Sequence, residues 1–167
     1  MQKRKNSNKV ILKDDEYFML LALKEAKKAY TKDEVPIGAV LVNDKKEIVA
    51  KAHNTSEYGI SALEHAELKV LTKGAKKTKS QRLWEHTLYV TIEPCTMCAT
   101  AISMMRIKRL IYGSPNPKGG AVLNGVKFFE SSSCFYKPEI LSGVLEEETS
   151  KILKDFFKNK RIQHKNH

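Results

Sequence analysis

The apolar residues of this chain change their spacing repeatedly, and this alternation constrains the fold more than any other feature. Segments with a helical period and segments rich in β-branched and aromatic residues follow one another along the sequence. Helices are expected at 14–32, 62–73 (stopping at Gly74), 94–105 and 146–160, and strands at 37–42, 47–53, 87–92 and 109–112. The first two strands predict a hairpin, whereas the later strands alternate with helices. The expected architecture is an α/β domain whose mixed sheet is covered by helices on both faces.

The length and composition are typical of one compact domain. The chain has 167 residues, 41% hydrophobic and 29% charged, and no internal linker, so residues 1–167 are expected to form a single domain. The lysine-rich ends, about 1–12 and 162–167, are expected to be flexible basic tails. No window is long and apolar enough to cross a bilayer, and the N-terminus lacks the apolar part of a signal peptide. A cytoplasmic protein with no membrane contact is therefore expected.

The net charge is strongly positive. Thirty Lys and Arg residues against nineteen Asp and Glu residues give a formal charge of +11. A surface of this kind attracts polyanions, which makes nucleic acid the leading macromolecular partner. A lysine-rich composition with solvated side chains explains the charge equally well, so the charge alone does not decide the partner.

Two short motifs carry residue types that bind transition metals. His65-Ala-Glu67 opens the second expected helix, and Pro94-Cys-Thr-Met-Cys98 opens the third. Cys95 and Cys98 lie three residues apart, hence on one face of a helix, and the N-terminal end of that helix favours their thiolate forms. One imidazole and two thiolates suit zinc, and three protein ligands leave a fourth position for water. The motifs together predict a catalytic zinc site held by His65, Cys95 and Cys98.

Glu67 fits the role of a proton carrier better than that of a fourth ligand. On a regular helix it points away from the face of His65, two residues earlier, but at the helix end it can reach a water molecule on the ion and act as general acid and base. Two alternatives stay open at this point: a redox-active Cys-x-x-Cys, or a closed structural zinc site with His53 or His86 as fourth ligand. Cys134 is expected to be a structural thiol.

The two motifs resemble the signature of zinc-dependent nucleobase deaminases, and further segments resemble bacterial tRNA-specific adenosine deaminases. The matching segments include Glu34-Val-Pro-Ile-Gly-Ala-Val40, His53-Asn54, 87–95, Lys118-Gly-Gly120 and 155–161. The resemblance covers about residues 14–161. It implies a three-layer α/β/α cytidine-deaminase-like fold with a mixed five-stranded sheet, one zinc ion per subunit and a homodimer. The implied reaction is hydrolytic conversion of adenosine to inosine at the wobble position, adenosine 34, in the anticodon stem-loop of a tRNA.

The resemblance assigns the same three metal ligands and the same proton carrier as the residue chemistry above. It also assigns Asn54 to recognition of the base, because an amide can both donate to and accept from a ring edge. A turn residue that ends the second strand is the alternative for Asn54. Val35 is expected to lie against the ring, and the backbone around Ala66 and Cys95 to complete the pocket. Attack at C6 of adenine then needs protons at N1 and at the departing ammonia, which one carboxylate can carry in turn.

Several positions depart from the family pattern where substrate contacts are expected. Glu64 precedes the expected zinc histidine, where the family usually has a small residue, and Ser61-Ala-Leu63 replaces its usual Asp-Pro-Thr. Asn116 stands where the family usually has aspartate, and Phe135-Tyr136 replaces an Asn-His pair. The two aromatic residues are expected to pack in the core, although aromatic rings also stack on RNA bases. These departures leave the metal chemistry intact and leave the choice of substrate open.

The expected last helix ends in cations. Lys158, Lys160, Arg161 and Lys165 follow two phenylalanines, which predicts a helix docked by Phe156-Phe157 with cations facing a phosphate backbone; a solvated basic tail is the alternative. We therefore expect a tRNA adenosine deaminase. Two other functions stay open: a deaminase of a free base or nucleoside of the guanine or cytosine type, and a non-catalytic zinc-stabilised RNA-binding module, in which Glu67 would be an ordinary helix carboxylate.

Overall fold

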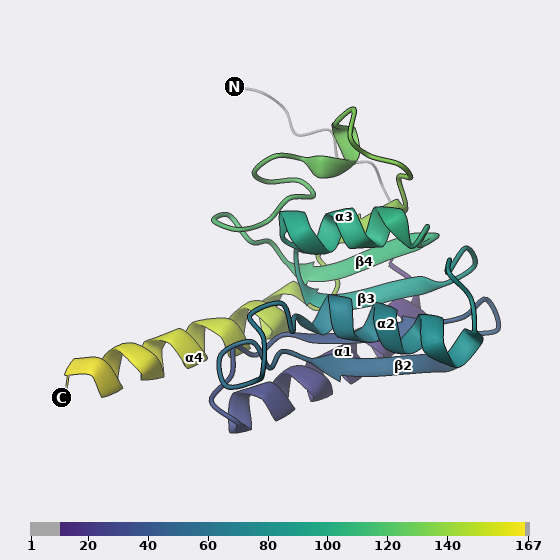
Figure 1. The fold of residues 1–167 in the computed structure, drawn as a ribbon. Coiled ribbons are helices and arrows are strands. Elements are labelled where there is room, and N and C mark those ends of the chain that lie inside the picture. The colour runs from purple at the N-terminus through teal and green to yellow at the C-terminus, as the bar shows by residue number, and fades with distance from the viewer. Residues whose placement is uncertain (1–10, 166–167) are drawn as a thin grey trace.

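The computed structural model describes residues 11–165, in which four α-helices surround a five-stranded sheet (Figure 1). In chain order the elements are α1 (Lys13–Thr31), β1 (Gly38–Val42), β2 (Ile48–His53), α2 (Ala66–Thr78), β3 (Thr87–Ile92), α3 (Thr96–Met104), β4 (Arg109–Ser114), the 3-10 helix η1 (Phe128–Glu130), β5 (Glu139–Ser142) and α4 (Glu146–Lys165). The sheet order is β2-β1-β3-β4-β5. β1 is antiparallel to both of its neighbours, whereas β3, β4 and β5 are parallel to one another. The expected mixed sheet of five strands is confirmed.

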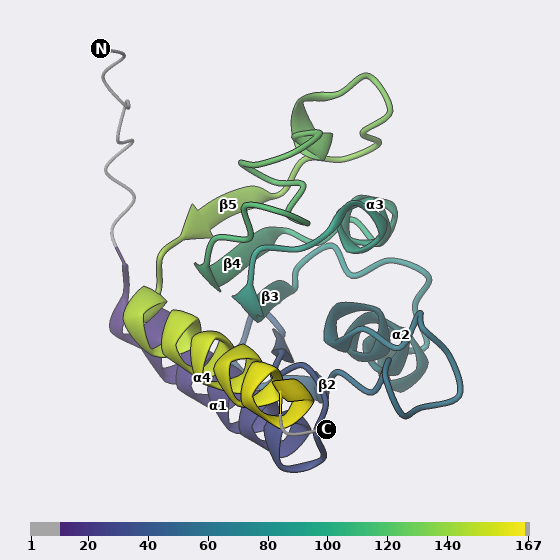
Figure 2. The same ribbon diagram turned by 90° about the vertical axis from the view of Figure 1, so that its left-hand side faces the viewer.

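The helices form two layers, one on each face of the sheet. Figure 2 shows α1 and α4 on one side and α2 and α3 on the other. Successive side chains of a strand point to opposite faces, and the buried residues divide accordingly: Leu41 and Leu88 belong to the core under α2 and α3, while Val40 and Tyr89 belong to the core under α1. All of β1 is buried, as expected for a strand covered on both faces. The three-layer α/β/α prediction is confirmed.

A glycine lets α1 lie directly on β1. A Cβ atom at Gly38 would sit 2.0 Å from the carbonyl oxygen of Ala22 and 2.5 Å from the backbone nitrogen of Ala26. Neither backbone atom can move without displacing the helix, and both alanines are fully buried. The position therefore requires glycine because of close backbone approach.

The boundaries of α2 differ from the prediction. The helix begins at Ala66 instead of residue 62 and continues through Gly74 to Thr78. A Cβ at Gly74 would lie 2.3 Å from Leu41 Cδ2, so this glycine serves the packing of α2 on β1. Lys79, in the left-handed conformation with φ 52°, ends the helix instead. The prediction was wrong because glycine inside a helix and glycine at its end look alike in sequence.

The fifth strand lay outside the segments expected from the sequence. β5 has four residues at the edge of the sheet, and its partly exposed side chains give no clear alternation. Of the two expected flexible tails, residues 1–10 and 166–167 lie outside the described part, whereas 162–165 continue α4. Within residues 11–165, no helix has both the length and the apolar character that crossing a membrane requires.

Candidate metal centre

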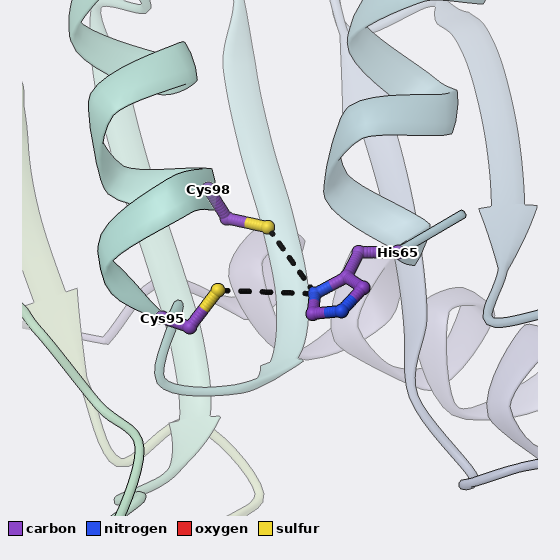
Figure 3. Close-up of side chains that lie close together, drawn as sticks. All are labelled: His65, Cys95 and Cys98. Carbon is purple, nitrogen blue, oxygen red and sulfur yellow. Dashed lines mark hydrogen bonds between the residues drawn. The ribbon is translucent and has the colours of Figure 1, made fainter. Parts of the chain in front are cut away.

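Three side chains of the types that bind metal ions, His65, Cys95 and Cys98, meet where α2 and α3 begin (Figure 3). His65 is the N-cap residue of α2, Cys95 is the N-cap residue of α3, and Cys98 lies in the first turn of α3. His65 Nδ1 lies 3.8 Å from the Sγ atom of Cys95 and 3.6 Å from that of Cys98. The three possible ligand atoms all lie within 4.8 Å of one another. β2 and β3 are each antiparallel to β1, so they run in the same direction and end at the same end of the sheet. The chain enters α2 after β2 and α3 after β3, which brings the two helix starts close together.

The spacing of these atoms fits a tetrahedral metal ion. Zinc bonds of about 2.3 Å to sulfur and about 2.0 Å to nitrogen, at the tetrahedral angle, separate the two ligand atoms by about 3.5 Å. The observed separations of 3.6 and 3.8 Å are close to this value. Among the described residues, neither His53 nor His86 joins the group; His53 Nδ1 instead lies 3.0 Å from Glu25 Oε2. The alternative of a closed site with either histidine as fourth ligand is therefore wrong.

The two sulfur atoms have opposite protonation tendencies. The Cys98 thiol donates to Cys95, which with the contact to His65 lowers the pKa of Cys95 to about 4 despite burial. The same hydrogen bond and burial raise the pKa of Cys98. The hydrogen bond to Cys95 also raises the pKa of His65. A cation between the three atoms would allow both sulfurs to ionise, as metal ligands must.

Glu67 lies buried in the first turn of α2, with only 2% of its surface exposed. Loss of solvation raises the pKa of its carboxyl group to about 7. Its Oε2 atom is buried and has no hydrogen-bond partner among the described residues. An unpartnered buried oxygen is costly, so its presence indicates a place for a water molecule or a substrate. The position suits a proton carrier.

Asn54 connects the end of β2 to the start of α2. Its side-chain Oδ1 accepts a hydrogen bond of 2.9 Å from the backbone N–H of Ala66, and its own backbone N–H donates to Ile37. No hydrogen bond of its side-chain NH2 group is seen within residues 11–165, so this group can donate to a ligand. Ala66 is fully buried, and Val35 is half-buried in the segment before β1. Base recognition by Asn54, Val35 and Ala66 stays a prediction.

The sequence reasoning gave no role to Glu93, which organises the loop beside the candidate centre. Its carboxylate accepts backbone hydrogen bonds from Asn116, Val122, Leu123 and Asn124 at 2.8–3.0 Å, and one of 2.6 Å from the Asn124 side chain. Burial raises its pKa, but these hydrogen bonds outweigh burial and lower it below the ordinary value. The signal available in the sequence was an acidic residue in an otherwise apolar strand end, immediately before the Pro-Cys motif.

The same loop also contacts the start of α3 directly. The backbone N–H of Ala121 donates to the carbonyl of Pro94, and Cys95 forms an isolated bridge with Gly120. Asn116, one of the departures from the family pattern, accepts a hydrogen bond from the backbone of Gly119 through its side chain and so supports a turn within the loop. The loop 116–124 is thereby fixed against the candidate centre.

Two other departures have polar or aromatic partners of their own. The Glu64 carboxylate accepts a hydrogen bond from the Thr55 hydroxyl, which in turn accepts one of 2.6 Å from Lys69. Phe135 is 65% exposed, so the expectation that it packs in the core was wrong. The ring of Tyr136 instead packs edge-on against the exposed ring of Trp84, 5.8 Å between centroids.

This aromatic pair lies away from the metal-binding group. Trp84 precedes β3 and Tyr136 precedes β5, whereas the metal-binding group lies beyond the other end of β3. The guanidinium of Arg106 sits 5.7 Å from the Trp84 ring centroid and 5.8 Å from that of Tyr136. Cys134 packs against the core nearby and contacts the Ser103 hydroxyl, in keeping with a structural thiol.

The last helix docks through one phenylalanine. Phe156 is buried and Phe157 is 45% exposed, so the expected pair of docking residues is reduced to one. Lys160 pairs with Asp33 instead of facing solvent freely. Lys158 and Arg161 are exposed, and the side chain of Lys165 lies outside the described part.

Comparison with known proteins identifies the family. The model of the MafB19-like deaminases matches residues 13–161. The tRNA-specific adenosine deaminase of Agrobacterium fabrum is 48% identical over 146 residues, covering 87% of this chain and 95% of the relative. That of Bacillus subtilis is 43% identical over 151 residues, covering 90% and 93%.

Solved structures agree with these sequence relatives. A structure from work on A-to-I editing by tRNA:A34 deaminases superposes with a TM-score of 0.80 at 47% identity, covering 82% of this chain and 99% of the other. A guanine deaminase from Nitrosomonas europaea superposes with a TM-score of 0.70 at 16% identity, which shows a shared fold. The chain therefore matches the MafB19-like deaminase model and belongs to the family of tRNA-specific adenosine deaminases.

Proposed function

We propose that this chain is a zinc-dependent hydrolase that converts adenosine 34, at the wobble position of a tRNA anticodon, to inosine in the cytoplasm, as a single deaminase domain. The observation that carries the proposal is the buried, unpartnered Oε2 of Glu67 next to His65, Cys95 and Cys98. The relatives named for this activity cover most of the chain. A non-catalytic RNA-binding module has no need for such a costly buried carboxylate.

His65, Cys95 and Cys98 would hold the zinc ion. Zinc bound there would supply Lewis acidity, lowering the pKa of a bound water molecule to about 7. Glu67 would accept a proton from water as the water oxygen bonds to C6 of adenine, and would deliver that proton to N1. It would then move the remaining hydroxyl proton to the amino group, which leaves as ammonia when the C6–N bond breaks. A carboxylate that repeatedly gains and loses a proton must not be committed to a permanent donor, which is the condition that its Oε2 meets.

The neighbouring residues would orient the base. Asn54 keeps its Oδ1 on the Ala66 backbone, so its NH2 group is the part that can donate to an acceptor on the purine ring. Val35 would provide an apolar contact for the ring, and the backbone at Ala66 would close the pocket. This division of the Asn54 amide would let one residue both fix the start of α2 and contact a substrate.

The proposed partners are a tRNA anticodon stem-loop and a second copy of this chain. The positive net charge and the exposed cations on α4 favour a polyanion. An apolar hollow of about 340 Å³ between α2 and α3 favours a homodimer, since exposed apolar patches mark interfaces. Its lining includes Leu68, Leu71, Ala101 and Met104, the last 52% exposed.

A tRNA assay tests the proposal. Purified protein is first analysed for metal, with about one zinc per chain expected for a mononuclear site. It is then incubated with an anticodon stem-loop carrying adenosine 34, with the same stem-loop carrying guanosine 34, and with free adenine, guanine, cytosine and their nucleosides. Inosine should form only in the first. Activity confined to the small molecules would mean that the substrate is a free base or nucleoside and not tRNA. No activity on any of these substrates would favour a non-catalytic RNA-binding module.

The role of Glu67 is tested by a matched pair of variants. Glu67→Gln should retain zinc and lose turnover, because it removes the proton carrier and no ligand. Glu16→Gln, the same change at an exposed position on α1, should leave both unchanged. Retained turnover in Glu67→Gln would refute the assigned role.

A further inference from the structure

A short loop borders the candidate centre. Residues 55–64 connect Asn54 to His65, so the loop lies between a proposed base-recognition residue and a proposed metal ligand. Its ends are closed by a hydrogen bond of 3.1 Å from the Thr55 N–H to the Glu64 carbonyl. Large aliphatic side chains of the loop are exposed, Ile60 almost completely and Leu63 by 60%. Such exposed apolar side chains beside a site can contact a substrate.

A buried carboxylate from the segment before β1 binds the backbone of this loop. Glu34, 2% exposed, accepts hydrogen bonds from the backbone N–H groups of Glu57, at 3.0 Å, and Tyr58, at 2.7 Å. At Gly59 an added Cβ would lie 2.0 Å from the carbonyl oxygen of Thr55, so the chain folds tightly on itself there. These contacts hold the backbone of the loop in one conformation.

A cluster of three residues joins the loop to the last helix. The Tyr58 hydroxyl donates a hydrogen bond of 2.9 Å to Asp33 Oδ2, and the ammonium group of Lys160 on α4 donates to the same oxygen. The Lys160 ammonium also lies 3.5 Å from the Tyr58 hydroxyl and 5.8 Å from the centroid of its ring. This hydrogen bonding from Lys160 lowers the pKa of Asp33. The Asp33–Tyr58–Lys160 cluster thus brings together α4, the segment after α1 and the loop 55–64.

We propose that Lys160 is a positioning residue that, through Asp33 and Tyr58, holds the loop 55–64 against α4, so that loop and helix present one pre-ordered surface to the RNA. The RNA substrate in this inference rests on the proposed function, whereas the contact between loop and helix does not. A surface ordered before binding avoids part of the entropy cost of association. The exposed Lys158 and Arg161 lie on the same stretch of α4 as Lys160 and add positive charge there that can contact phosphates.

A simpler role for Lys160 would be a direct phosphate contact. The two roles differ in their dependence on Tyr58, which carries no charge, and on Asp33, whose negative charge would repel RNA. If Lys160 only bound phosphate, Tyr58→Phe would have no effect and Asp33→Asn would strengthen binding. If the cluster positions the loop, both changes weaken binding in the same way as Lys160→Met. Because Asp33 and Tyr58 are exposed and Lys160 is only partly buried, these variants should fold normally.

Hydrogen exchange and kinetics test the proposal together. Full-length wild type, Lys160→Met, Tyr58→Phe and Asp33→Asn are compared without RNA for amide exchange in residues 55–64, which should be several-fold faster in all three variants. The control Lys158→Met removes the same charge from another lysine of α4, which forms no ion pair within the described residues. It should leave the amide exchange of the loop unchanged. With the adenosine-34 stem-loop, the three cluster variants should show a KM raised by about two- to five-fold, the size expected for an exposed pair, with kcat nearly unchanged.

A double variant sharpens the result. Lys160→Met combined with Tyr58→Phe should be no worse than the more severe single variant, because both changes break one shared contact. Unchanged exchange in Lys160→Met, or equal effects of Lys158→Met and Lys160→Met on KM without any change in the loop, would overturn the positioning role. A wild-type protein that forms no inosine would contradict the proposed function instead, and the exchange data would still decide the contact between loop and helix.

Discussion

Replacing Glu93 by Gln should destabilise the fold far more than a usual loss of one charge. The residue is almost fully buried, and its two carboxylate oxygens accept five hydrogen bonds from the loop 116–124. Oε1 accepts from the backbone of Val122, Leu123 and Asn124. Oε2 accepts from the backbone of Asn116 and from the side chain of Asn124. Glutamine retains the first oxygen and replaces the second by an NH2 group, which then faces two donors.

The magnitude follows from these contacts. A hydrogen bond to a charged acceptor contributes about 1.5–3 kcal/mol, and the change removes two of them. Rotation of the Asn124 amide can restore one by presenting its oxygen to the new NH2 group. The expected loss in the free energy of unfolding is therefore about 2–4 kcal/mol, a large fraction of the roughly 5–15 kcal/mol that stabilises a typical domain.

Urea unfolding followed by far-UV circular dichroism, at constant excess zinc, measures this loss. The matched control is Glu139→Gln, an exposed glutamate 3.6 Å from the Arg109 guanidinium, which should change stability by less than about 0.5 kcal/mol. A loss in Glu93→Gln no larger than that of the control would refute the reasoning.

The effect should also depend on pH. The folded protein holds Glu93 with a lowered pKa, so the ionised carboxylate stabilises the fold fully above its unfolded pKa of about 4.3, and this stabilisation is lost as the pH falls through the folded pKa. The difference between wild type and Glu93→Gln should be constant above about pH 5 and shrink below it. A difference that grows on acidification would contradict the sign of the shift.

Three further predictions concern packing, acid stability and metal. Gly38→Ala should cost about 3 kcal/mol or more in urea unfolding, because its Cβ overlaps backbone atoms of α1, whereas Ala at exposed Lys45 should be nearly neutral. His86 has buried ring nitrogens without partners among the described residues and a pKa lowered by burial, so stability should fall as the pH drops below about 6.5, and His86→Phe should flatten this dependence; equal pH profiles would exclude His86 as the cause. A chelator should lower the Tm of wild type but not of Cys98→Ser, because a metal ion stabilises only a folded protein whose site can bind it. Equal shifts of Tm in both proteins would argue against a metal ion at this position.

The candidate centre was predictable from sequence to an unusual degree because its chemistry depends on local spacing. His65, Cys95 and Cys98 occupy two helix starts, and the helical period alone places the cysteines on one face. The structure adds that the two starts meet, with separations suited to a tetrahedral ion. The alternation of strand and helix patterns predicted the α/β class and the layers for the same reason, since periodicity reports which side chains are buried.

The errors arose where a residue's role depends on a distant partner. Gly74 was taken as a helix end because the sequence does not show that Leu41 packs against it. Phe135 was expected in the core, yet its ring is exposed, and its backbone carbonyl accepts a hydrogen bond from Arg106. The edge strand β5 has only four residues, so its pairing with β4 had to be seen in the sheet.

By itself, the sequence determined the fold class and predicted the candidate metal-binding group and the proposed proton carrier, because each depends on the spacing of a few residues along one or two elements. Only the tertiary structure decided what Glu93 and Lys160 do. The Glu93 carboxylate is satisfied by a loop 23–31 residues later, and Lys160 by a carboxylate 127 residues earlier. Contacts of that separation leave no periodic trace in a single sequence, since folding alone brings the partners within hydrogen-bond distance.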